Sequence, residues 1–181
     1  MQMIAAGVEP SPANPDWPRY SSSPFPAYRF VPGTNPHPRR SPQGHSFGCP
    51  EPRPTPCRPD DWSQSKDYRF GIDLYNFAYW WECHEIFEGF WHAVGRTTEQ
   101  GRFFQALIHL AAANLKHFTK HEAAASRLRE KSLRLIAGLP DRYMGIDLAE
   151  FRTRLKDAEI PGSSDALLVT LESVRDRPTR A

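Results

Sequence analysis

The stretch "YWWECHEIFEGFWH", from Tyr79 to His92, decides the fold of this 181-residue chain. Its fourteen residues include three tryptophans, two phenylalanines, two histidines and three glutamates. The apolar residues recur at helical spacing and occupy more than one side of the helix. A helix that is apolar on two sides belongs in the centre of a bundle. We therefore expect a central helix over residues 79–94, ended by Gly95.

A histidine and a glutamate lie one helical turn apart inside this stretch. On a helical wheel the expected core stripe consists of Tyr79, Cys83, Ile86 and Phe90. His84 and Glu88 lie opposite that stripe, among tryptophans, and Glu82 lies in the sector that faces water. We expect His84 and Glu88 to be buried in an aromatic box. A buried carboxylate must be paired, protonated or bound to a cation.

The remaining periodic segments predict further helices over residues 68–77, 99–119 and 122–137. Asp147 is expected to cap another helix, and a last helix is expected from Ser163 or Ser164, burying Leu167, Leu171 and Val174. No strand-like alternation follows residue 67. The predicted fold class is all-α, a small bundle of about five to six helices over residues 67–177.

The N-terminal third of the chain is a proline-rich arm. Residues 1–59 contain 15 of the 18 prolines, and proline resists helix formation. We expect an extended arm over residues 1–66. Within it, residues 25–48 should dock on the bundle, because they hold Tyr28, Phe30, Val31 and Phe47. Residues 1–18, with Trp17 as an isolated large apolar side chain, should stay undocked.

Composition argues against several classes of protein. The formal net charge of +2 and the lack of a basic stripe disfavour nucleic-acid binding. No apolar run has the length of a membrane span or of a signal peptide. The three cysteines form no Cys-x-x-Cys pair, and their odd number argues against a disulfide framework. We expect a soluble cytoplasmic protein of undetermined oligomeric state.

The segments "YNFAYWWECHEIFEGFW" and "FFQALIHLAAANLK" resemble a prokaryotic family called domain of unknown function 309. Its hallmark, His-x-x-x-Glu-x-x-Trp/Tyr, is met by His84, Glu88 and Trp91. The arm segment "YRFVPGTNPHPRRSPQGHSFG" resembles the longer members, so the resemblance covers roughly residues 28–145. It implies a small helical bundle whose motif has been suggested to bind metal. Ala78 stands where the family usually has glycine, and His109 where glutamine or lysine is common.

These observations predict a His/Glu/Trp pocket that binds a divalent metal ion or a small polar ligand. His84 and Glu88 are the candidate catalytic groups and metal ligands, and the arm could add His37 and His45 if it folds over the central helix. Trp91, Trp81 and Gln105 are the candidate lining residues. A metal-dependent hydrolase is one function that this pocket could serve.

Two other readings remain open. His84 and Glu88 could form a structural buried pair, with the tryptophans as ordinary core. The alternative function is a non-catalytic helical protein-interaction module whose arm docks a partner as an extended peptide.

Overall fold

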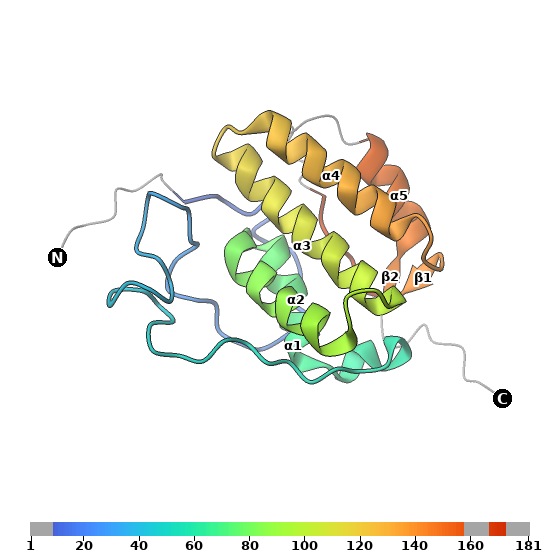
Figure 1. The fold of residues 1–181 in the computed structure, drawn as a ribbon, viewed down its shortest axis with the longest axis horizontal. Coiled ribbons are helices and arrows are strands. Elements are labelled where there is room, and N and C mark those ends of the chain that lie inside the picture. The colour runs from blue at the N-terminus through green and yellow to red at the C-terminus, as the bar shows by residue number, and fades with distance from the viewer. Residues whose placement is uncertain (1–8, 158–166, 173–181) are drawn as a thin grey trace.

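The computed structural model describes residues 9–157 and 167–172, and it is an all-α bundle held against a long irregular arm (Figure 1). The helices in chain order are the 3₁₀ helix η1 (Pro59–Gln64), α1 (Lys66–Asn76), α2 (Trp80–Val94), α3 (Glu99–Phe118), α4 (Glu122–Ile136) and α5 (Leu148–Asp157). A two-stranded antiparallel hairpin, β1 (Arg142–Tyr143) and β2 (Ile146–Asp147), precedes α5. The predicted fold class is confirmed, and η1 is a short helix within the segment assigned to the arm.

Local sequence explains where the helices begin. The Ser65 hydroxyl caps α1 by accepting from the backbone N–H of Tyr68, and Thr98 caps α3 by accepting from that of Gly101. Asp147 accepts from the N–H of Glu150 at 2.9 Å, so its predicted capping role is confirmed. These caps occupy backbone donors that the first turn of a helix leaves unpaired.

The junction between α1 and α2 contains one residue in the left-handed backbone conformation. Ala78 has φ +66°, and the N–H of Tyr79 donates to the carbonyl of Leu74 at 2.8 Å, which closes the end of α1. Glycine adopts this conformation without strain, whereas Ala78, with its Cβ, adopts it at an energetic cost.

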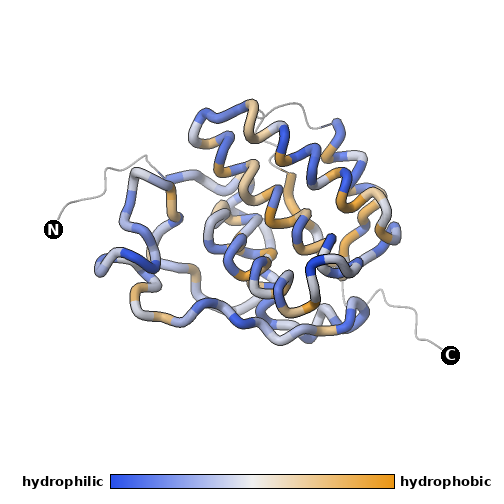
Figure 2. The backbone as a smooth tube through the Cα atoms, viewed as in Figure 1, coloured by the Kyte–Doolittle hydropathy of each residue, from blue (hydrophilic) through white to orange (hydrophobic). Residues whose placement is uncertain are grey.

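Helix α3 lies between α2 and α4 and provides the centre of the core (Figure 1). Phe104 is fully buried and stacks on Phe90, with ring centroids 4.7 Å apart, while Phe87 lies 6.1 Å from it. Hydrophobic residues gather inside the bundle, whereas the arm is mostly hydrophilic (Figure 2). The core face of α2 is therefore Cys83, Phe87 and Phe90, so Phe87 takes the place expected for Ile86. Burial raises the pKa of the Cys83 thiol well above its usual value, consistent with an inert core residue.

A buried carboxylate on α1 holds the arm near its start. Asp73 accepts from the backbone N–H groups of Tyr20 (2.7 Å) and Ser21 (2.9 Å) and from Nε of Arg19 (2.9 Å). Trp17 packs against the core, so the expectation that it stays undocked is wrong for this residue. Residues 1–8 lie outside the described part of the chain.

The expected last helix is wrong over residues 167–172, which are not helical. The Asn76 amide, buried in α1, donates to the Val169 carbonyl and accepts from its N–H, both at 2.8 Å. The N–H of Leu171 donates to the Tyr20 hydroxyl, and that of Glu172 to the Gly145 carbonyl. Because the bundle already uses these backbone groups, they are not available to a helix. Ser163, Ser164 and Val174 lie outside the described residues.

Asn76→Ala should destabilise the protein by about 2–4 kcal/mol, because two hydrogen bonds are lost and the Val169 backbone is left buried and unpaired. Urea unfolding followed by circular dichroism measures this. Thr170→Ala, at an exposed neighbouring position, is the control and should change stability by less than about 0.5 kcal/mol. Equal stability of the two variants would contradict the role of Asn76.

Candidate metal site

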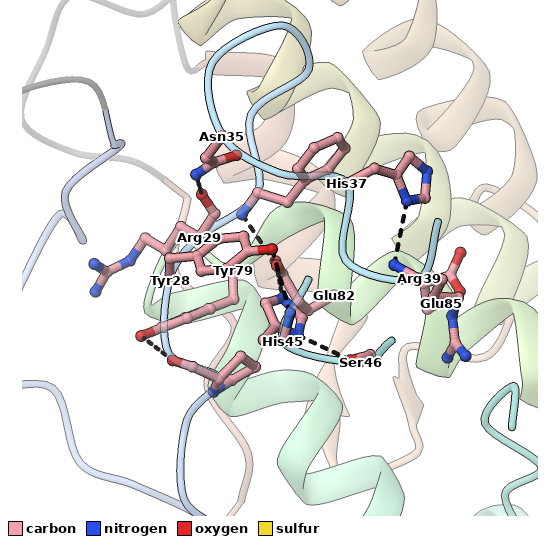
Figure 3. A network of polar contacts seen from close by, with 12 residues as sticks. Tyr28, Arg29, Asn35, His37, Arg39, His45, Ser46, Tyr79, Glu82 and Glu85 are labelled. Carbon is pink, nitrogen blue, oxygen red and sulfur yellow. Dashed lines mark hydrogen bonds and ion pairs between the residues drawn. The ribbon is translucent and has the colours of Figure 1, made fainter. Parts of the chain in front are cut away.

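The second buried carboxylate, Glu82 on α2, faces the arm and not water. Its side chain is 5% exposed, and its Oε1 accepts from the N–H of Phe30 and from Nε2 of His45, both at 3.0 Å (Figure 3). Tyr28, Phe30 and Val31 are buried alongside, while Phe47 is half exposed. The solvent-facing position expected for Glu82 is therefore wrong, because the arm covers this side of α2.

His45 is engaged at both ring nitrogens. Besides Glu82 at Nε2, the Ser46 hydroxyl lies 2.8 Å from Nδ1, and the Tyr28 ring packs 4.6 Å away. The structure thus brings His45 to Glu82 and not to Glu88. Residues 44–48 read Gly-x-Ser-x-Gly, the pattern of a nucleophile elbow. They lie in a loop, without the strand and helix that an elbow requires.

His37 lies against the aromatic side chains of the arm and α2. Its ring packs 5.4 Å from Trp81 and 5.1 Å from Phe30, and its Nδ1 accepts from the backbone N–H of Arg39 at 3.2 Å. Two of the residues proposed from sequence, His37 and Trp81, therefore meet.

The side chains that could bind a metal ion lie on the face of α2 next to the one that carries Glu82. One ligand atom from each of His84, Glu85 and Glu88 can be chosen so that all lie within 4.8 Å of one another. Nδ1 of His84 is 3.7 Å from Oε1 of Glu85, and its Nε2 is 3.9 Å from Oε2 of Glu88. His92 approaches the other oxygen of Glu88, with Nε2 at 3.8 Å from Oε1. Helix α2 thus brings His84, Glu85 and Glu88 together, and His92 lies beside Glu88.

His84 and Glu88 are not sealed in an aromatic box. Their side chains are 31% and 41% exposed, so the expectation of a fully buried pair is wrong. The physical reason is the orientation of α2, which directs Phe87 into the core and leaves His84 and Glu88 at its flank. Even so, Nδ1 of His84 is itself inaccessible to solvent and has no hydrogen-bond partner among the residues that the structure describes.

An open groove of about 560 Å³ borders this cluster. Its lining residues are Glu51, Pro52, Arg53, Pro54, Glu85, Glu88, Gly89, His92 and Ala93. Gly89 permits the close approach of the arm, since a Cβ there would lie 2.6 Å from Cδ of Pro54 and 2.7 Å from the Pro52 carbonyl oxygen. The groove therefore has one wall from α2 and one from the arm.

The other lining candidates lie away from the centre of the cluster. Trp91 packs against His92, with ring centroids 5.2 Å apart, and the Arg96 guanidinium lies 4.7 Å from its ring centroid. Gln105 is partly buried on α3 and is not among the residues lining the groove. His109, on the same helix, lies in the field of Lys131 on α4.

Sequence reasoning missed Glu85 and Arg39 and misplaced Glu82. Nε of Arg39 donates to Oε2 of Glu85 at 2.8 Å, across 46 residues of sequence. The signal that was available is the carboxylate pair Glu82 and Glu85, one helical turn apart, together with a basic segment, "HPRR", in the arm.

Glu82→Leu should destabilise the protein by about 3–5 kcal/mol, because Phe30 N–H and His45 lose a buried charged partner. Amide exchange of residues 28–46 should become faster than in the wild type, and by a larger factor than the exchange of α3. Exchange of these residues as slow as in the wild type would contradict the role of Glu82 in holding the arm.

Protein stability should fall as pH drops below about 6.5, the ordinary histidine value, through His109. Burial, and then the Lys131 charge, lowers the pKa of His109, so the unfolded chain takes up a proton before the folded one does. Unfolding free energies of His109→Gln, measured from pH 7 downward, should depend less on pH. The exposed His121→Gln is the control, and identical pH profiles of both variants would contradict the prediction.

Comparison with known proteins supports the family suggested by the motifs. The comparison with curated proteins gave no match. The family model for a domain of unknown function, DUF309, matches residues 68–128, which span α1, α2, α3 and the first part of α4. The match includes His84, Glu85, Glu88 and Trp91 and excludes the arm. Over residues 68–128, this chain is therefore similar to the DUF309 family.

Proposed function

We propose that this protein binds a divalent metal ion through His84, Glu85 and Glu88 on α2. The observation that carries the proposal is the convergence of one imidazole and two carboxylates within 4.8 Å, beside a groove that both glutamates line. Nδ1 of His84 supports it, because this nitrogen is shielded from solvent and has no hydrogen bond to any described residue, so it gains from a ligand.

The three groups can reach the spacing of a transition-metal site by side-chain rotation. Ligands at about 2.0–2.2 Å from a tetrahedral ion lie about 3.4 Å from each other. One ligand atom of each residue lies within 4.8 Å of those of the other two, so side-chain rotation has to shorten separations of up to 4.8 Å to reach this spacing. Imidazole suits zinc and iron, and carboxylates also suit manganese. We propose zinc, iron or manganese as the bound metal.

The groove gives this site a place for a small polar ligand. Three protein ligands leave a coordination position open, and an ion held in this way can lower the pKa of a bound water to near 7. Small residues, Gly89 and Ala93, line the groove on α2, and Arg53 supplies a positive charge on the arm. The function that fits this arrangement best is a metal-dependent hydrolase acting on a small polar substrate.

Glu88→Gln should weaken zinc binding by more than the roughly 10–100-fold that loss of an outer-shell partner costs, because a ligand charge is removed. Competition with a chromophoric chelator measures the affinity. Glu130→Gln is the matched control, since Glu130 is exposed on α4 and makes a surface pair with Arg134.

His84→Ala should reduce the metal content of the purified protein by elemental analysis. Wild-type protein that binds no zinc, iron or manganese in this titration would contradict the metal site. Equal affinities of Glu88→Gln and Glu130→Gln would contradict its assignment to α2.

A further inference from the structure

The carboxylate of Glu85 is shared between the arm and the candidate metal site. Its Oε2 accepts from Nε of Arg39 at 2.8 Å, and its Oε1 lies 3.7 Å from Nδ1 of His84. The two oxygens therefore have different neighbours, one in the arm and one on α2. Both partners of the ion pair are largely buried, with Arg39 19% and Glu85 18% exposed, so solvent screens this contact less than a surface pair.

Arg39 is itself fixed by the arm. Its Nη1 donates to the backbone carbonyls of Cys49 at 3.1 Å and Pro50 at 3.0 Å. Its Nε donates to Glu85, and Figure 3 shows the two side chains near each other. A guanidinium is planar, so contacts at both Nε and Nη1 determine its orientation. The carbonyls it binds directly precede residues 51–54, which form the arm wall of the groove.

We propose that Arg39 is a positioning residue of the metal site, and this inference rests on the proposed function. By holding Oε2, Arg39 leaves Oε1 free and directed toward His84. A glutamate without a fixed partner samples several rotamers and loses that freedom on binding a metal. The contact with Arg39 removes most of that freedom beforehand. Hydrogen bonds to ligating carboxylates from an outer shell act in this way in metal sites generally.

The positive charge of Arg39 acts in the opposite direction, because it repels a cation. Two features limit this repulsion. The guanidinium is paired with Glu85 itself, and it contacts the oxygen that does not face His84. We therefore expect the positional effect to exceed the repulsion. The two effects predict opposite signs for the removal of Arg39, which makes the inference testable.

Metal binding and arm docking are then linked. If Arg39 strengthens metal binding, the bound metal must strengthen the contact of Arg39 with Glu85 by the same factor. The ordering of residues 37–50, and with it the arm wall of the groove, becomes dependent on the metal. The groove would thus be best formed when the site is loaded.

Arg39→Gln should weaken Co²⁺ binding by about 10–100-fold, measured from the visible absorption of the bound ion in the full chain. Arg40→Gln is the matched control, because it removes the same charge from the next residue, whose side chain is exposed. Its affinity should equal that of the wild type. Co²⁺ binding by Arg39→Gln that is as tight as, or tighter than, that of Arg40→Gln overturns the inference while leaving the metal site in place.

Arg39→Lys separates position from charge and provides a second variant if Arg39→Gln folds poorly. Lysine keeps the charge but cannot hold Glu85 and two carbonyls in one planar arrangement, so its affinity should lie between those of wild type and Arg39→Gln. Wild-type affinity in Arg39→Lys would show that charge suffices and would overturn the positional role.

Amide exchange of residues 37–50 with and without Zn²⁺ tests the linkage. Zinc should slow exchange there in wild type and not in Glu88→Gln, which retains the contact between Arg39 and Glu85. Zinc that binds to the wild type without slowing exchange would overturn the linkage. A wild type that binds neither Co²⁺ nor Zn²⁺ would instead remove the metal site itself.

Discussion

The architecture depends on two buried carboxylates that bind the backbone of the arm where residues 9–58 have no helix or strand. Asp73 on α1 accepts from the N–H groups of Tyr20 and Ser21, and Glu82 on α2 accepts from that of Phe30. An irregular segment can be buried only if its polar groups find partners. The many prolines reduce the number of N–H groups that need one. Each carboxylate also has a basic partner from the arm, Arg19 for Asp73 and His45 for Glu82. The arm therefore fits this bundle because the backbone donors of Tyr20, Ser21 and Phe30 meet carboxylates on α1 and α2.

Features encoded locally in the sequence could be predicted, and features set by distant contacts could not. Helical periodicity and capping residues such as Asp147 located the helices well, because both depend on neighbours within a turn. The helical wheel of α2 predicted the core face only in part. Because α2 has two apolar sides, its orientation is determined only by contacts with α3 and the arm. The segment at 167–172 has apolar residues at helical spacing, yet Asn76 takes its backbone hydrogen bonds. The residues of that segment do not themselves indicate that Asn76, 93 residues away from Val169, is their hydrogen-bond partner.

The same distinction applies to the candidate site. The spacing of His84 and Glu88 was visible in the sequence, and the structure brings them within 3.9 Å. Arg39 and Glu85 are separated by 46 residues, so their contact emerges only from the path of the arm. The alternative function, a protein-interaction module, stays a hypothesis. That hypothesis requires an arm that is free to bind a partner, whereas Tyr28, Phe30 and Val31 are already buried within the chain. The arm is better understood as the second wall of the groove.

The attachment of residues 167–172 has a consequence for the order in which the protein can be assembled. The Tyr20 hydroxyl accepts from the N–H of Leu171 across 151 residues, and Asn76 binds Val169. A chain emerging from the ribosome can form the hairpins of α2, α3 and α4 from local contacts well before these residues are synthesised. Until then the buried amide of Asn76 has no partner from this segment and depends on water. Residues 167–172 are thus the last described part of the chain to join the bundle, and a nascent chain halted before them would lack both hydrogen bonds between Asn76 and Val169.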